Sequence, residues 1–164
     1  MHLSFPITKK GKSIRFSETD VRPMGRAAAG VKAMNISEDD EIVGMEIVEL
    51  GKEILTVTEK GFGKRTLFDE YRIQRRGGSG IINYKVTKKT GKVVAAKSVD
   101  DANELIMISS DGTIIRTKIG TISKTGRSAQ GVTLMKLSDE HVIMSIEKIV
   151  SYDDVEENED GIDE

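Results

Sequence analysis

The chain has 164 residues, of which 37% are hydrophobic and 32% charged, a composition typical of a soluble globular protein that can bury a core. It contains no cysteine, which excludes disulfides and thiolate metal sites, and it has no apolar run near the roughly 20 residues that span a bilayer. The first residues lack the basic and long apolar regions of a signal peptide, so we expect a cytoplasmic protein without membrane association.

The formal net charge of −2 hides an uneven distribution of charge. Eight of the 27 acidic side chains fall within residues 153–164, which contain no basic residue. Residues 1–152 therefore hold 19 acidic side chains against all 25 basic ones, a net charge of +6. A basic body followed by an acidic tail is typical of nucleic-acid-binding proteins. We predict that the tail, residues 153–164, is disordered.

A pattern of glycine and arginine recurs three times along the chain. Equivalent positions lie 50 or 51 residues apart, which divides residues 1–152 into repeats of roughly 4–50, 51–101 and 102–152. The anchors are Gly11, Arg15, Arg26, Gly30 and Val31 in the first repeat, Gly61, Arg65, Arg76, Gly80 and Ile81 in the second, and Gly112, Arg116, Arg127, Gly131 and Val132 in the third.

The first two repeats contain short strand signals and no sustained helix. In the first, residues 17–20 favour a single helical turn, which Pro23 ends. In the second, residues 54–58 and 62–66 are β-favouring runs joined by a turn, and residues 67–70 again suit one helical turn.

The third repeat gives the clearest strand pattern. Residues 105–109 and 113–117 flank Asp111-Gly112, a strong hairpin signal, and further strands are expected at 132–137 and 142–146. About four strands per repeat predict an all-β, propeller-like fold. A WD40 propeller is disfavoured because the chain has no tryptophan, and a kelch propeller because aromatic residues make up only 4%.

Residues 74–80, Gln-Arg-Arg-Gly-Gly-Ser-Gly, place two guanidinium groups before three glycines. Glycine permits close approach of a partner, and arginine offers a planar fork of donors that suits phosphate oxygens. This stretch, which we call the box, is either a clamp for a polyanion or a sharp solvated turn.

Four segments carry a family resemblance: residues 11–16, 20–26, 61–66 and 126–132. Over about residues 8–150 the chain resembles the C-terminal domain of the bacterial DNA gyrase A subunit. The resemblance implies a β-pinwheel, a propeller in which neighbouring blades exchange strands and whose basic rim wraps double-stranded DNA. That family has about six blades, so three repeats imply a partial, open array.

The box matches six of the seven positions of the gyrase hallmark, and Ser79 departs from it by replacing an expected cation. The resemblance therefore implies the wrapping module of DNA gyrase, a type IIA topoisomerase that introduces negative supercoils using ATP. Its partners would be DNA, the rest of the gyrase A subunit, which is the parent chain, and the B subunit, which carries the ATPase. The alternatives are the corresponding C-terminal domain of topoisomerase IV and a β-repeat scaffold that binds protein.

The candidate DNA contacts are cations and box residues: Gln74, Arg75, Arg76, Gly77, Gly78, Arg72, Lys64, Arg26, Arg127, Lys88 and Lys89. For Arg76, Arg127 and Arg26, blade architecture and DNA contact both remain open. The strand arginines of the repeats, Arg15, Arg65 and Arg116, are expected to pair with carboxylates such as Asp20 or Glu70.

No catalytic chemistry is indicated by the sequence. The box is not followed by the Lys-Ser/Thr of a phosphate-binding loop, and His2 and His141 are isolated. We therefore expect no active site, no cofactor and no metal in this chain, which would be a non-catalytic part of a larger enzyme.

Overall fold

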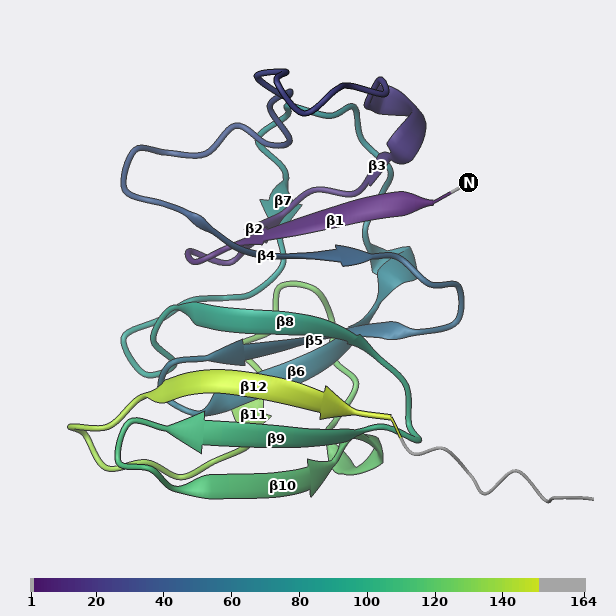
Figure 1. The fold of residues 1–164 in the computed structure, drawn as a ribbon. Helices are drawn as coiled ribbons and strands as arrows, with labels where there is room; N and C mark the ends of the chain where they lie inside the picture. The colour runs from purple at the N-terminus through teal and green to yellow at the C-terminus, as the bar shows by residue number, and fades with distance from the viewer. Residues whose placement is uncertain (1, 151–164) are drawn as a thin grey trace, which may run out of the picture.

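A computed structural model describes residues 2–150 of the chain, and the predicted acidic tail lies outside these residues. Three antiparallel sheets follow one another in chain order from top to bottom of Figure 1. The only helices among residues 2–150 are three 3-10 turns, η1 (Glu18–Asp20), η2 (Phe68–Glu70) and η3 (Ile119–Thr121). The all-β prediction is confirmed, as are the helical turns expected in the first two repeats.

Each sheet forms one blade. Blade 1 contains β1 (Leu3–Thr8), β2 (Lys12–Ser13), β3 (Phe16–Ser17), β4 (Ile42–Ile47) and β7 (Ile81–Ile82). Blade 2 contains β5 (Glu53–Thr58), β6 (Phe62–Leu67), β8 (Val93–Val99) and β11 (Val132–Thr133). Blade 3 contains β9 (Glu104–Ser109), β10 (Ile114–Lys118) and β12 (Ile143–Ile149).

Neighbouring blades exchange strands, as the family resemblance implied. β7 belongs to the second repeat but pairs with β2 of blade 1, with Ile81 opposite Ser13. β11 belongs to the third repeat but pairs with β6 of blade 2, with Val132 opposite Gly63. Each repeat therefore completes the blade of the repeat before it.

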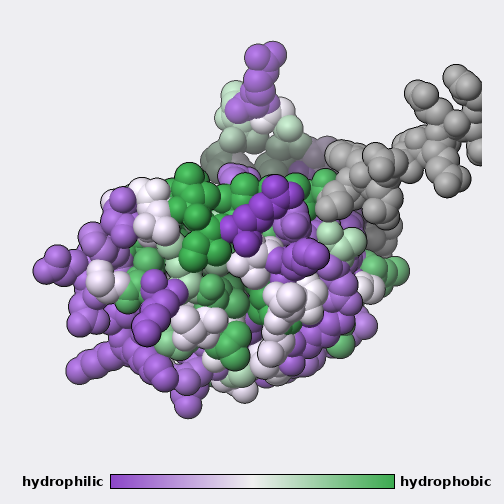
Figure 2. All heavy atoms as spheres, turned by 90° about the horizontal axis from the view of Figure 1, so that it is seen from below, coloured by the Kyte–Doolittle hydropathy of each residue, from purple (hydrophilic) through white to green (hydrophobic). Residues whose placement is uncertain are grey.

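The described array is open at both ends. Residues 31–32, which correspond to β7 and β11, form no strand. Within residues 2–150, nothing pairs with the edge of β10, which is the counterpart of β2 and β6. Figure 2 views the molecule from the side of β10, where hydrophobic side chains gather among hydrophilic ones. The prediction of a partial, open array is confirmed for these residues.

The hairpins inside the blades follow the glycine pattern. At the Asp111-Gly112 turn, the Gly112 amide donates to Ser109 O at 3.0 Å, and β9 and β10 pair on either side. The Gly61 amide donates in the same way to Thr58 O at 3.1 Å. Both glycines have φ near +80°, at +82° and +83°, a conformation that costs L side chains energy.

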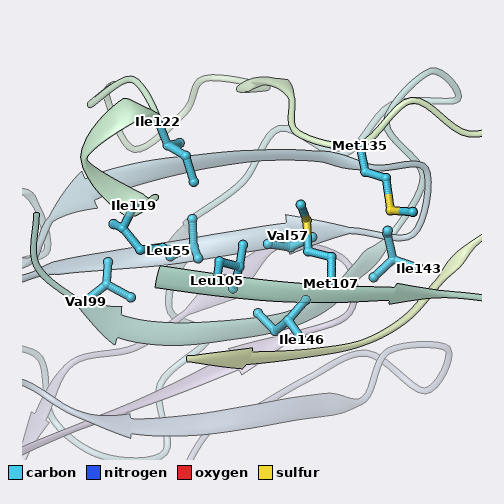
Figure 3. Packing of buried hydrophobic residues seen from close by; sticks show 10 residues of the cluster. All are labelled: Leu55, Val57, Val99, Leu105, Met107, Ile119, Ile122, Met135, Ile143 and Ile146. Atoms are coloured by element: carbon cyan, nitrogen blue, oxygen red, sulfur yellow. The ribbon is translucent and has the colours of Figure 1, made fainter. Parts of the chain in front are cut away.

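Apolar cores lie between the blades. Figure 3 shows the core between blades 2 and 3, where side chains of β5, β8, β9 and β12 meet those of η3 and its following loop. A second core between blades 1 and 2 contains an edge-to-face cluster of Phe5 with Phe68 and Tyr71, at ring-centroid distances of 5.4 and 4.7 Å. Each fully buried aliphatic or aromatic side chain contributes about 1.5–3 kcal/mol, so the blade junctions hold the fold together.

Candidate nucleic-acid interface

The backbone of the box lies along the first repeat. The Gln74 amide donates to Arg15 O at 2.7 Å and the Gly77 amide to Ala33 O at 2.9 Å, while Gly78 O accepts from the Asn35 amide at 2.9 Å. Gly80 has φ +71°, and a Cβ there would collide with Ser13 O. Gly80 is therefore required for the box to dock against the first repeat.

The Arg76 side chain is a clamp between repeats. Its Nε donates to Asp20 O at 3.0 Å and its Nη1 to Lys32 O at 2.6 Å. Arg127 acts in the same way one repeat later, because its Nη1 donates to Ile82 O at 2.6 Å. Of the two interpretations left open by the sequence, these contacts favour blade architecture for Arg76 and Arg127.

Asp20 and Glu70, the acids predicted to pair with the strand arginines, accept hydrogen bonds from backbone amides instead. The Asp20 carboxylate accepts from the Arg76 amide at 3.4 Å, and the Glu70 carboxylate accepts from the Arg127 amide at 2.9 Å. The predicted pairing of Asp20 or Glu70 with the strand arginines is therefore wrong. In the sequence, Asp20 and Glu70 each lie five residues after a strand arginine. In the fold, the next repeat brings Arg76 to Asp20 and Arg127 to Glu70 instead.

The strand arginines occupy carbonyls and other acids instead. Arg15 donates to Phe68 O at 2.8 Å and to Tyr71 O at 3.1 Å. The Arg65 Nε donates to Ile122 O at 2.8 Å, and its Nη1 lies 3.5 Å from Glu53 Oε2. The architectural function predicted for these two arginines is supported, because each reaches across to the 3-10 turn region of the following repeat.

Arg72 and Arg75 are the free cations of the box region. Both side chains are exposed, and neither takes part in an ion pair among residues 2–150. Arg75 lines a shallow hollow with Asp20 and Arg76. Beside it, Gln74 Oε1 is buried and has no hydrogen-bond partner among the described residues. The box thus separates into a docked part and the outward guanidinium group of Arg75, and Arg72 just before the box adds a second outward guanidinium group.

Lys64 is not available to DNA in this structure, which corrects its place among the candidates. Its side chain is buried, and Nζ donates to Gly126 O at 2.8 Å and to Arg127 O at 2.6 Å. Burial lowers the pKa of Lys64 to about 8. The sequence suggested a solvent-facing strand cation, but the loop of the next repeat covers it.

The remaining candidates are exposed. Arg26 has the repeat position of Arg76 but no earlier repeat to clamp among the described residues. Lys88 and Lys89 lie in the turn before β8, where Lys89 Nζ is 5.5 Å from the ring centroid of Phe62.

One further lysine, Lys85, was missed as a candidate DNA contact. Lys12 and Lys85 line one groove of about 520 Å³, and both are exposed. Lys10 lines it too, but its ammonium pairs with Asp39. The repeat gave a signal for Lys85, because Lys136 occupies the same position 51 residues later and is also exposed.

None of the helices in the described part of the chain is long and apolar enough to cross a membrane.

Comparison with known proteins gives a consistent result. The family model described as "DNA gyrase C-terminal domain, beta-propeller" matches residues 7–49, 52–100 and 103–149. The DNA gyrase A subunit of Staphylococcus epidermidis (strain ATCC 12228 / FDA PCI 1200) is 43% identical over 149 residues, which is 90% of this chain and 17% of that protein. The same protein of Staphylococcus aureus (strain MRSA252) is 41% identical over 155 residues, covering 93% of this chain and 17% of that protein.

Solved structures agree with the family model. A DNA gyrase A C-terminal domain superposes with a TM-score of 0.84 at 31% identity, covering 91% of this chain and 51% of that one. A topoisomerase IV C-terminal domain superposes with a TM-score of 0.85 at 23% identity, covering 92% and 47%, which shows the shared fold alone. The chain spans about half of these domains and about a sixth of the curated relatives. It belongs to the DNA gyrase C-terminal domain family of β-propellers.

Proposed function

We propose that this chain binds and wraps double-stranded DNA as a non-catalytic part of the DNA gyrase A subunit. The observation that carries the proposal is a division within the box region: the Arg76 side chain and the backbone of the box dock it onto the first repeat, while Arg75 of the box and Arg72 just before it remain exposed and unpaired among the described residues. Guanidinium groups held on a rigid loop bind phosphate oxygens well because the loop is already ordered before binding.

Wrapping follows from the distribution of further cations beside the donated strand and in the loops next to it. Lys12 and Lys85 flank the donated strand β7, and Lys88 and Lys89 lie in the turn that follows. Contacts to the phosphate backbone position a duplex without reading its sequence, and each contact releases condensed counterions. Bending 20–30 base pairs costs of order 1–6 kcal/mol, so several cations have to act together.

In the parent enzyme, the module would act in the cytoplasm with the remainder of the gyrase A subunit, to which it belongs, and with the B subunit, which hydrolyses ATP. Wrapping would present one DNA segment for passage in a fixed sense, and this gives ATP-dependent negative supercoiling its direction.

A salt titration of duplex binding tests the proposal. The logarithm of the binding constant should fall linearly with the logarithm of salt concentration, with a slope of about −0.9 per phosphate contact. Arg75→Ala should reduce the slope by roughly 0.9, and the double variant with Arg72→Ala by roughly twice that. The matched control is Lys97→Ala, because Lys97 lies on β8, at the opposite edge of blade 2 from the donated strand. A flat salt dependence would favour the protein-binding scaffold.

Ligation of relaxed circles in the presence of the chain tests wrapping separately from binding. Wrapped circles should keep a changed linking number after the protein is removed. Loss of this change in the Arg72→Ala/Arg75→Ala variant would support the gyrase-type box. An unchanged result would favour the topoisomerase IV alternative, in which other cations carry the wrap.

The acidic tail gives a further proposal about regulation of the same surface. Residues 153–164 carry eight carboxylates beside a body of net charge +6, so we propose that the tail competes with DNA for the cations. Deleting residues 153–164 should raise DNA affinity at low salt and have less effect at high salt, where screening weakens the competition. Equal affinities at low salt would contradict it.

A further inference from the structure

Blade 2, which lies between the other two blades in Figure 1, differs from blade 1 at one position of its outer edge. Lys12 on β2 lies opposite Ile82 of the donated strand β7, and Phe62 on β6 lies opposite Thr133 of the donated strand β11. These registers give Lys12 and Phe62 the same place on consecutive blades. Blade 2 therefore has an aromatic ring where blade 1 has an exposed cation.

A lysine from another element restores the charge at this place. Lys89, in the turn before β8, holds its Nζ 5.5 Å from the centroid of the Phe62 ring. The electron density of an aromatic face attracts an ammonium group in this position. An ammonium carries three donors, and Lys89 is exposed, so the donors that point away from the ring can reach an acceptor in solvent.

The turn before the last strand is basic only in the second of the three repeats. Residues 38–41 of the first repeat are Glu-Asp-Asp-Glu, and residues 139–140 of the third are Asp-Glu. In the first repeat, two of these acids form ion pairs with the neighbouring hairpin, Glu41 with Lys9 and Asp39 with Lys10. The second repeat has Lys-Lys-Thr-Gly-Lys at residues 88–92 instead, so its turn cannot neutralise the hairpin in this way.

Hydrogen bonds within the turn fix the backbone that carries Lys89. The Thr87 amide donates to Thr90 Oγ1 at 3.0 Å, and the Thr90 amide donates to Thr87 Oγ1 at 3.2 Å. Thr90 is fully buried. The Lys60 ammonium joins the turn to the β5–β6 hairpin, because its Nζ donates to Lys88 O at 2.6 Å. With the backbone held in this way, only the side chain of Lys89 remains to be oriented.

A hollow of about 290 Å³ lies beside the Phe62 ring, and its lining contains a competing partner for Lys89. The loop before β12 contributes Asp139 and His141 to this lining, opposite Lys60 and Lys89 of the basic side. In the described part of the chain, Lys89 forms no ion pair with Asp139, and its ammonium lies over the ring. The ring therefore orients this lysine in the structure, and the carboxylate does not.

We propose that Phe62 is a positioning residue that holds Lys89 for a phosphate of the DNA backbone. The pair gives blade 2 the contact that Lys12 supplies directly in blade 1. This inference rests on the proposed function, because it adds a phosphate contact to the same wrapping surface. A side chain that is already oriented loses less freedom when it binds. Cation–π pairs at exposed sites correspond to a factor of roughly two to five in an equilibrium constant, which is the gain in DNA affinity expected from Phe62.

A double-mutant cycle measured by duplex binding tests the proposal. Phe62→Leu removes the ring but no charge, so it should weaken binding roughly two- to fivefold and leave the salt slope unchanged. Lys89→Gln should reduce the slope by roughly 0.9, as the loss of one phosphate contact requires. In the Lys89→Gln background, Phe62→Leu should have no further effect. Phe62→Tyr keeps the ring and should bind DNA as the wild type does.

Lys88→Gln is the matched control, because Lys88 is an exposed lysine of the same turn whose carbonyl, not its ammonium, contacts the hairpin. Phe62→Leu should weaken binding by the same factor with or without this substitution. Circular dichroism shows whether each variant keeps its fold. Proton NMR of the free wild-type chain tests the contact without any variant, since the ring current of Phe62 should shift the ε-methylene protons of Lys89 upfield.

The outcomes separate this inference from the proposed function. A wild-type chain that does not bind duplex DNA would overturn both. Normal binding, with additive effects of Phe62→Leu and Lys89→Gln, would overturn the positioning by Phe62 alone. Unshifted ε-methylene protons of Lys89 would do the same. Coupling of Lys89→Gln to Asp139→Asn in place of Phe62→Leu would also contradict the inference, because an ion pair would then orient the lysine.

Discussion

The junction between blades 2 and 3 and the open end of blade 3 place equivalent residues of two repeats in different environments. Arg65 and Arg116 occupy equivalent positions, and each pairs with an equivalent glutamate, Glu53 or Glu104. The Arg65 side chain is 4% exposed and the Arg116 side chain 60%. The difference arises because η3 and the following loop cover Arg65, and no described segment covers Arg116. The next repeat thus decides whether a repeated arginine is architectural.

Removing the two arginines should give the largest contrast in stability. Arg65→Met should lower the free energy of unfolding by roughly 3 kcal/mol, because Glu53 stays buried and the carbonyls of the third repeat lose their donor. Lys124, whose Nζ is 2.8 Å from Glu53, keeps the loss near the lower end of what buried pairs show. Arg116→Met should cost about 0–1 kcal/mol, as exposed pairs do. Urea unfolding measures both, and equal losses would contradict the comparison.

The hairpin glycines offer a second matched pair. Gly61→Ala and Gly112→Ala introduce the same backbone strain, since φ is +83° and +82°. At Gly61 the new methyl group would also collide with the Met135 carbonyl, whereas the space at Gly112 is open. Gly61→Ala should therefore cost about 1–3 kcal/mol more. Thermal unfolding of the two variants measures the difference, and a similar melting temperature would show that the junction yields to the extra group.

Lys64 makes the covered junction sensitive to pH. Its pKa is about 8 in the folded chain against 10.5 for an ordinary lysine, because burial disfavours its charged form. Between these values the unfolded chain binds more protons, so stability should rise with pH. The slope for this group is at most about 1.4 kcal/mol per pH unit.

Comparison with Lys64→Met isolates this effect. The measurement is urea unfolding between about pH 8 and 9.5, below the ionisation of ordinary tyrosine. The stability of the wild type should rise relative to the variant over this interval. Parallel curves would mean that Lys64 stays charged in its buried position.

The smallest effect is expected within the box itself. Arg75→Ala should change stability by less than about 0.5 kcal/mol, because the side chain is exposed. Arg76→Ala should cost about 1 kcal/mol, since the bonds to Asp20 O and Lys32 O are lost. Differential scanning calorimetry resolves this order, and a reversed order would show that Arg75, not Arg76, docks the box.

The sequence alone predicted those structural features that depend on neighbouring residues or on the repeat pattern. The Asp111-Gly112 hairpin and the short helical turns follow from residues close together in the chain, and these predictions are confirmed. Strand exchange was expected only from the family resemblance, because donated strands of two residues, such as β7 and β11, show no periodicity of their own. The DNA contacts themselves stay a prediction.

The errors all concern contacts between repeats. Within its own repeat, Lys64 resembles a solvent-facing strand cation. Its carbonyl acceptors belong to Gly126 and Arg127, which follow it by 62 and 63 positions in the chain. The carboxylates of Asp20 and Glu70 accept from arginine amides 56 and 57 positions away. No pattern within one repeat specifies such partners, although the repeated arginine at positions 76 and 127 suggested a shared structural task.

Strand donation also bears on how such wheels change their number of blades. Each repeat contains both an acceptor hairpin and a donor segment at a constant distance, since Gly61 and Gly80 are separated by 19 residues, as are Gly11 and Gly30. Recombination that adds or removes one whole repeat therefore leaves every internal donor with an acceptor. A crossover in the middle of a repeat separates the two and exposes an apolar edge. Duplication in whole units is thus the route by which the gene can lengthen without loss of folding.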